Sequence, residues 1–262
     1  MGFDAHPPAD GLLIDLDGTL WEDGKLIAGA GEAIDALRTA GIPFRFLTNT
    51  TRKPRSTLVA ELAGLGIETS TYECFTAPAA AAIWLGRRGV GRVSLLIAEA
   101  SFEDFSGFEL DDETPEAVVI GDLGRGWTFD ALDRAFRAVI AGADLIALQK
   151  NRYWKTAGRL SLDAGPFVAA LEYATGKQAT LVGKPSRELF HTMAAELDLP
   201  PERVAMVGDD IEADVEGARA ANLQAVAVRT GKYRPADEKW AREAATTVID
   251  SLAGLPAWLR LG

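Results

Sequence analysis

Short apolar stretches that end in polar residues recur along this chain, and they constrain its fold more than any other feature. The first runs from Gly11 to Leu16 and is followed by Asp17, Gly18 and Thr19, as expected of a buried strand with an exposed carboxyl end. Further strands are expected at 43–47, 93–98, 117–120, 145–148, 179–182, 204–207 and 225–228. Helices are expected at 30–40, 54–65, 77–88, 129–140, 165–175, 187–197 and 213–221.

This alternation of strands and helices predicts an α/β fold with a doubly wound, Rossmann-like parallel sheet. The middle third of the chain has strands and helices of its own, which predicts a second α/β unit. In open parallel sheets, ligands bind beyond the carboxyl ends of the strands. The polar residues that directly follow each strand are therefore the candidates for a functional site.

Composition excludes several classes of function. Apolar residues make up 48% of the 262 residues, and the net charge of −11 argues against a nucleic-acid or anionic-membrane partner. Cys74 is the only cysteine, which excludes an intrachain disulfide framework and indicates a reducing, cytoplasmic compartment. No stretch reaches the roughly 18 to 20 apolar residues of a membrane span. We therefore expect a cytoplasmic protein without a membrane segment.

Acidic, hydroxyl and lysine side chains follow four of the expected strands. They are Asp15 with Asp17, then Thr48, then Lys184, and finally Asp209 with Asp210 and Asp214. Two carboxylates held close together repel each other unless a cation lies between them, and Mg²⁺ suits hard carboxylate oxygens. Each position alone has a simpler interpretation, because such residues also cap helices or occupy loops. Together they predict magnesium-assisted phosphoryl transfer.

The segments DLDGT, LTNT, GKP and GDDIEAD, in this order, resemble the four motifs of haloacid dehalogenase superfamily phosphatases. The resemblance spans nearly the whole chain and is strongest to the subfamily with a large α/β cap between the second and third motifs. Within it, segments such as ALQKNRYWK and VRTGKYRPADE resemble two groups, the phospholysine phosphohistidine inorganic pyrophosphate phosphatases and the domain-containing-protein-2 hydrolases. The resemblance implies a catalytic core at 1–76 and 182–262, with an inserted α/β cap at 77–181.

The resemblance also assigns roles to the residues that match its motifs. Asp15 would be the nucleophile that forms an aspartyl-phosphate, and Asp17 would act as general acid and then as general base. Thr48 and the adjacent Asn49 would hydrogen-bond phosphoryl oxygens, and Lys184 would neutralise developing charge. The metal would be held by three groups, which are Asp15, the carbonyl of Asp17, and Asp209. Asp210 and Asp214 would be outer carboxylates that orient water or the lysine.

The cap would determine which substrate is accepted. Arg152 and Lys155 are candidates for pairing with a second anionic group on the substrate. An equally weighted interpretation is that these basic residues and their aromatic neighbours cover a surface or a dimer contact. Cap-mediated dimers in the subfamily make a homodimer through the cap an expectation.

The activity expected is hydrolysis of a small phosphorylated metabolite, either a phosphate monoester, a pyrophosphate or a phosphoramidate. Three other functions are open to such a site. A phospho-acceptor signalling domain has no inserted cap, and Asp17 would shorten the lifetime of its phosphoryl mark. A phosphotransferase, or a non-catalytic protein that binds a phosphorylated ligand, would use the same fold.

Overall fold

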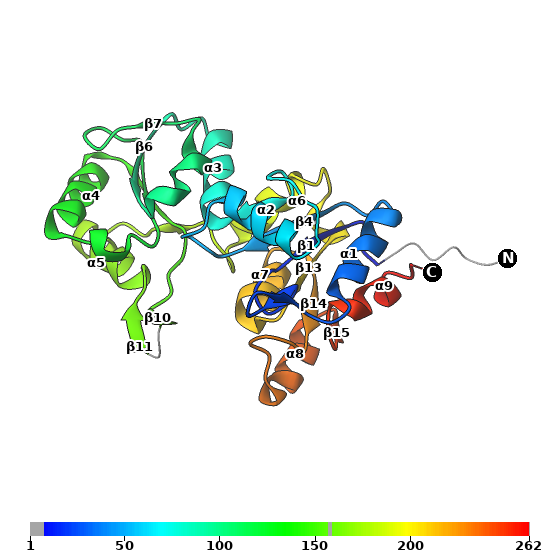
Figure 1. Ribbon diagram of the computed structural model, residues 1–262. Coiled ribbons are helices and arrows are strands. Elements are labelled where there is room, and N and C mark those ends of the chain that lie inside the picture. The colour runs from blue at the N-terminus through cyan, green and yellow to red at the C-terminus, as the bar shows by residue number, and fades with distance from the viewer. Residues whose placement is uncertain (1–7, 157–158, 262) are drawn as a thin grey trace. The chain divides into compact units, whose positions relative to one another are not determined.

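The computed structural model describes residues 8–156 and 159–261 and shows an α/β protein with two compact units (Figure 1). The first unit comprises residues up to 48 together with 58–75 and 184–262, and the second comprises 49–57 and 76–183. Parallel strands with flanking helices confirm the α/β class that the sequence predicts. Compactness alone assigns no role to either unit, so the division into a catalytic core and a cap stays a prediction.

The first unit is built on a six-stranded sheet with the order β15-β14-β13-β1-β4-β5. Strand β1 lies between β13 and β4 and runs parallel to both, with Ile14 opposite Val207 on one side and Phe46 on the other. The strands are β1 (Gly11–Ile14), β4 (Phe44–Thr48), β5 (Cys74–Thr76), β13 (Val204–Gly208), β14 (Gln224–Val228) and β15 (Thr247–Ile249). Every residue of β1 and β13 is buried, as expected of central parallel strands.

Alternation along β1 determines which side chains share a face of this sheet. Leu12 and Ile14 pack in one apolar cluster with Ile34 and Leu37 of α1, whereas the intervening Leu13 lies outside that cluster. Residues of α2 and α9 belong to the same cluster, so these three helices cover one face. The helices of this unit are α1 (Ala30–Thr39), α2 (Arg55–Gly64), α6 (Arg187–Ala195), α7 (Gly217–Ala220), α8 (Glu238–Ala244) and α9 (Leu255–Trp258).

A small antiparallel hairpin is the next pair of strands along the chain after β1. It consists of β2 (Trp21–Glu22) and β3 (Lys25–Leu26), with Trp21 opposite Leu26. Trp21 is buried in the same apolar cluster as β1 and α1. The hairpin is therefore anchored to the core of the first unit at the residue where it begins.

The second unit has a five-stranded sheet with the order β12-β9-β8-β6-β7. Its strands are β6 (Arg92–Leu96), β7 (Glu109–Leu110), β8 (Ala117–Ile120), β9 (Asp144–Ala147) and β12 (Thr180–Leu181). A separate antiparallel pair, β10 (Tyr153–Thr156) and β11 (Arg159–Leu162), follows β9. The sequence patterns did not predict this pair. The side chains of 154–156 and 159–160 are outside the described part of the chain.

Helices lie on both faces of the second sheet, as Figure 1 shows for α3, α4 and α5. Val119 and Ile146 pack with α3 (Ala77–Arg87), whereas Val118 and Leu145 pack with α4 (Phe129–Ala141) and α5 (Gly165–Thr175). The second unit therefore has a layered core of its own. In the part of the chain that the structure describes, no helix combines the length and the apolar character of a membrane span.

One expected helix is different in the structure. The sequence predicts a continuous helix over 213–221, but the chain forms a π-helical turn over Ile211–Glu216 before α7 begins at Gly217. The N–H of Val215 donates to the carbonyl oxygen of Asp210 at 3.3 Å, which is the wider spacing of a π turn. Turns of this kind occur often at functional sites.

Candidate active site

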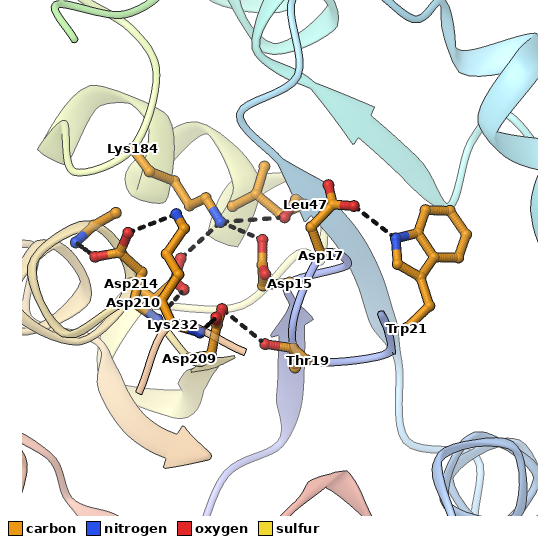
Figure 2. Close-up of polar contacts among 11 residues, drawn as sticks. Asp15, Asp17, Thr19, Trp21, Leu47, Lys184, Asp209, Asp210, Asp214 and Lys232 are labelled. Atoms are coloured by element: carbon orange, nitrogen blue, oxygen red, sulfur yellow. Dashed lines mark hydrogen bonds and ion pairs between the residues drawn. The ribbon is translucent and has the colours of Figure 1, made fainter. Parts of the chain in front are cut away.

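The candidate site lies where β1 and β13 end in the first unit (Figure 2). Asp15 follows β1, and its backbone N–H donates to the carbonyl oxygen of Val207 in β13 at 2.9 Å. Asp209 follows β13, so the parallel register brings the two aspartates to the same edge of the sheet. Both side chains are buried.

Lys184 connects two of the aspartates. Its Nζ lies 2.5 Å from Oδ1 of Asp15 and 2.6 Å from Oδ1 of Asp214, and it also donates to the carbonyl oxygen of Leu47 at 3.5 Å. Only 4% of the lysine side chain is exposed. Burial alone would lower the pKa of Lys184, but the charges of Asp15 and Asp214 outweigh it and raise this pKa, so the lysine is charged.

Three buried carboxylates lie close together here, and two of them, Asp15 and Asp214, pair with the ammonium group of Lys184. One oxygen from each of Asp15, Asp209 and Asp214 lies within 4.8 Å of the others. Burial raises the pKa of Asp15 to about 6 and that of Asp214 to about 7, although Lys184 opposes both shifts. Burial also raises the pKa of Asp209. The cluster therefore has more negative charge than its protein partners neutralise.

This donor set fits a hard divalent cation, because carboxylate oxygens are the ligands that Mg²⁺ prefers. Both oxygens of Asp214 have protein partners, since Oδ1 faces Lys184 and Oδ2 accepts from the backbone N–H of Asp210 at 3.2 Å. Asp15 meets the lysine through Oδ1. Asp214, whose Oδ1 lies 2.6 Å from the ammonium group, is therefore the candidate for an outer partner that orients Lys184. Asp15 and Asp209 stay the expected direct ligands.

Asp209 is held by the loop after β14. The backbone N–H of Lys232 donates to its Oδ2 at 2.6 Å, and the hydroxyl of Thr19 donates to its Oδ1 at 3.4 Å. Gly18 and Gly231 have positive φ angles of 86° and 58°, and a Cβ on either would overlap Oδ2 of Asp209. Only glycine fits this close approach at a left-handed conformation.

Asp210 has a different environment from its neighbour. Its Oδ1 accepts from the backbone N–H of Ala213 at 3.0 Å, and its Oδ2 lies 2.8 Å from Nζ of Lys232. Burial would raise the pKa of Asp210, but the hydrogen bonds from Lys232 and Ala213 outweigh it and the pKa is lowered. Asp210 therefore begins the π-helical turn and pairs with Lys232.

Asp17 is an exposed residue that directly precedes the turn at 18–20, before the hairpin begins. Its Oδ1 accepts a hydrogen bond of 2.8 Å from Nε1 of Trp21, as Figure 2 shows. Thr48 ends β4 in the first unit and is buried. The boundary between the two compact units falls directly after Thr48, so Asn49 belongs to the second unit.

The two candidate residues of the expected cap lie in the second unit. Arg152 is exposed, next to the start of β10. The side chain of Lys155 lies outside the described residues. The structure therefore groups Asp15, Asp17, Lys184 and the three later aspartates in the first unit, apart from Asn49, Arg152 and Lys155 in the second. The roles expected of all these residues stay predictions.

Sequence reasoning missed three residues that contact these aspartates. They are Thr19, Trp21 and Lys232. Lys232 had a usable signal, because it lies in the polar loop that follows the strand at 225–228, where strand-end residues gather. The contacts of Thr19 and Trp21 depend on the backbone path between Asp15 and the hairpin, which no sequence pattern indicated.

Three features of this parallel sheet define the class of haloacid dehalogenase-like hydrolases. They are an aspartate after a central strand, a buried lysine, and an acidic pair after the neighbouring strand. Residues 12–109 match a family model described as haloacid dehalogenase-like hydrolase, and residues 181–255 match one described as HAD-hydrolase-like.

Curated relatives and solved structures agree with these matches. Haloacid dehalogenase-like hydrolase domain-containing protein 2 of Rattus norvegicus is 41% identical over 87% of each chain. Phospholysine phosphohistidine inorganic pyrophosphate phosphatase of Bos taurus is 39% identical over 93% of this chain and 91% of the relative. The structure of 4-nitrophenylphosphatase from Thermotoga maritima has a TM-score of 0.85 with 27% identity, covering 95% of this chain and 97% of that one. The chain belongs to the haloacid dehalogenase-like hydrolase family, which confirms the resemblance.

Proposed function

We propose that this enzyme is a magnesium-dependent phosphatase that hydrolyses a small phosphorylated metabolite through an aspartyl-phosphate on Asp15. The observation that carries the proposal is the buried cluster of Asp15, Asp209 and Asp214 around Lys184. Two relatives of the chain bear phosphatase names, one for phospholysine, phosphohistidine and pyrophosphate and the other for 4-nitrophenyl phosphate. The proposed substrate is therefore a phosphate monoester, a pyrophosphate or a phosphoramidate.

In the first proposed step, a carboxylate oxygen of Asp15 attacks phosphorus and the bond to the leaving group breaks. Asp17 gives its proton to the leaving oxygen or nitrogen. Lys184, which lies 2.5 Å from Asp15, neutralises negative charge on the reacting groups, while Thr48 and Asn49 hydrogen-bond the phosphoryl oxygens. In the second step, Asp17 removes a proton from water, which attacks phosphorus and restores the carboxylate of Asp15.

The metal would be held by Asp15, the carbonyl oxygen of Asp17, and Asp209. When bound, it would offset the negative charge of the carboxylates and the phosphoryl group. Asp214 would hold Lys184 in place, and Asp210 would hold Lys232. Within the same proposal, the second compact unit is the cap, where Arg152 and Lys155 select the substrate and a homodimer forms. A reducing compartment such as the cytoplasm fits the single cysteine.

The test is phosphate release from a panel of phosphate esters, pyrophosphate and phospholysine, with Mg²⁺ and with chelator. Asp15→Asn removes the nucleophile, and Asp250→Asn is the matched control because the side chain of Asp250 is 93% exposed. The proposal expects metal-dependent release by the wild type and the control, and none by Asp15→Asn. Release that is unaffected by chelator, or retained in Asp15→Asn, would refute it.

A further inference from the structure

The carboxylate of Asp17 has one protein hydrogen bond in the described part of the chain. The indole Nε1 of Trp21 donates to Oδ1 of Asp17 at 2.8 Å, and the two side chains face each other in Figure 2. The residues are four positions apart and form an isolated β-bridge. No other described side chain donates to this carboxylate.

Trp21 is fixed much more firmly than Asp17. Its side chain belongs to the buried apolar cluster, with the residue only 6% exposed, whereas Asp17 is exposed. The backbone of Trp21 is held at both ends, since its N–H donates to the carbonyl oxygen of Leu16 at 3.1 Å and its carbonyl oxygen accepts from Gly18 at 2.7 Å. Trp21 also pairs with Leu26 in the hairpin.

The difference in burial determines which of the two side chains restricts the orientation of the other. An exposed aspartate can turn about its side-chain bonds and be hydrated in several orientations. A buried indole can neither turn nor leave without exposing its apolar ring, and its N–H needs a partner. The indole therefore limits the orientations of the carboxylate, rather than the carboxylate limiting those of the ring.

We infer that Trp21 is a positioning residue for Asp17, whose indole N–H fixes the carboxylate oxygen Oδ1 and leaves Oδ2 as the proton-transferring oxygen. This inference rests on the proposed function, in which Asp17 is the general acid and base. An N–H donor faces an oxygen that carries no proton, so a protonated Asp17 carries its proton on Oδ2. That proton passes from Oδ2 to the leaving oxygen in the first step, and a proton from water returns to Oδ2 in the second.

The test uses Trp21→Phe, which keeps an aromatic ring in the core but removes the N–H donor. Two substrates are compared by kcat/KM, which reports transfer of the phosphoryl group to Asp15. An alkyl phosphate has a poor leaving group that needs the acid, whereas 4-nitrophenyl phosphate has a good one that needs it little. General acid catalysis contributes about 10²- to 10⁴-fold, and we expect a loss of about tenfold on the alkyl ester and at most about twofold on the nitrophenyl ester.

A double-mutant cycle separates positioning from a structural role. In an Asp17→Ala background, Trp21→Phe should cause no further loss of kcat/KM, because the group that it positions is absent. Any of three results would overturn the inference. Trp21→Phe could lower kcat/KM equally on both esters, it could lower it on neither, or its loss could persist in the Asp17→Ala background. If Trp21→Phe does not fold, benzothienylalanine placed at position 21 gives the same comparison with the shape of the indole and no N–H.

The outcomes also separate this inference from the proposed function. If the wild type releases no phosphate from either ester, the proposed function fails and the inference fails with it. If the wild type is active and Asp17→Ala lowers kcat/KM more on the alkyl ester, the role of Asp17 stands. If Trp21→Phe then changes kcat/KM equally on both esters, the inference about Trp21 is wrong but the proposed function stands.

Discussion

Two acidic clusters in the first compact unit contain similar residues but have opposite electrostatic properties. At the strand ends, Asp15, Asp209 and Asp214 are buried close together, and the ammonium group of Lys184 pairs with Asp15 and Asp214. Near the end of β14, two carboxylates and two guanidinium groups form an ion-pair network on the surface. That network consists of Glu238, Asp250, Arg229 and Arg242.

The pKa values follow this difference. Burial raises the pKa of Asp214 to about 7, whereas hydrogen bonds from Arg229 and Tyr233 lower the pKa of Glu238 to about 2. The exposed cluster is balanced in charge, so it needs no further cation. The buried cluster has an excess of negative charge, which is the property that makes it a candidate metal and catalytic site. Burial and charge imbalance therefore distinguish the two clusters better than the number of acidic residues does.

The largest difference is expected in catalysis. Asp15→Asn should lower kcat by more than about 10⁴-fold, because an amide oxygen cannot replace the carboxylate nucleophile. Asp250→Asn in the exposed cluster should leave kcat within about twofold, since its side chain is 93% exposed and has no part in the proposed chemistry. Steady-state phosphate release with Mg²⁺ measures both. Comparable losses in the two variants would remove the functional distinction between the clusters.

The second difference concerns stability. Lys184→Met leaves Asp15 and Asp214 without their buried cation, and breaking such a pair costs about 3 to 5 kcal/mol in the free energy of unfolding. Arg229→Met in the exposed network should cost much less, because solvent screens exposed ion pairs. Denaturant unfolding in chelator gives both values. A larger loss in Arg229→Met would contradict the account of the buried cluster.

The third difference is the direction in which pH changes the free energy of unfolding. The pKa of Asp214 is raised from 3.8 to about 7 in the folded state, so the folded state binds more protons than the unfolded state between those values. In chelator, this group should therefore lower stability as pH rises from about 4 to about 7, and Mg²⁺ should reverse the loss. The pKa of Glu238 is lowered from 4.5 to about 2, so its contribution to stability should disappear as pH falls through that range.

Unfolding curves measured across pH in Asp214→Asn and Glu238→Gln assign the two effects. Asp214→Asn should weaken the decline between pH 4 and 7, and Glu238→Gln should weaken the decline below pH 4.5. An unchanged pH profile in either variant would show that the neighbouring groups, rather than the named carboxylate, control that range.

The smallest effect is expected for Lys232, an exposed residue that contacts both Asp209 and Asp210. The side chain of Lys232 is 71% exposed and pairs with Asp210, while its backbone N–H holds Asp209. Lys232→Met keeps the backbone bond and should change the free energy of unfolding by less than about 1 kcal/mol. Calorimetric Mg²⁺ titration should give nearly the wild-type affinity. A complete loss of Mg²⁺ binding would mean that the side chain, and not the backbone, organises the site.

Much of the site could be predicted because the strands at its centre are apolar and buried. The runs that became β1 and β13 end at Asp15 and Asp209, and parallel register alone brings such positions together. Asp214 was predicted as an outer partner from the family resemblance. Asp214 forms its ion pair with Lys184 from a π-helical turn. The residues of 213–221 indicated an ordinary helix instead.

The contacts of Trp21 and Lys232 could not be predicted from the same patterns. Trp21 reaches Asp17 because the turn at 18–20 brings the backbone of Trp21 back to Leu16 and Gly18. Lys232 acts on Asp209 through its backbone N–H, which any residue type except proline could supply. Such contacts depend on local backbone path rather than on residue type, so the structure was needed to find them.

In the proposed mechanism, Asp15 of the buried cluster becomes phosphorylated during turnover. The most direct measurement is acid quenching of Asp17→Asn with 4-nitrophenyl phosphate and Mg²⁺, followed by mass-spectrometric mapping of the phosphorylated peptide. Because Asp17→Asn cannot activate water, a phosphoryl group should accumulate on Asp15 with Mg²⁺ and be absent in chelator. Phosphate release by this variant without a phosphopeptide, or with the phosphoryl group on another residue, would contradict the account.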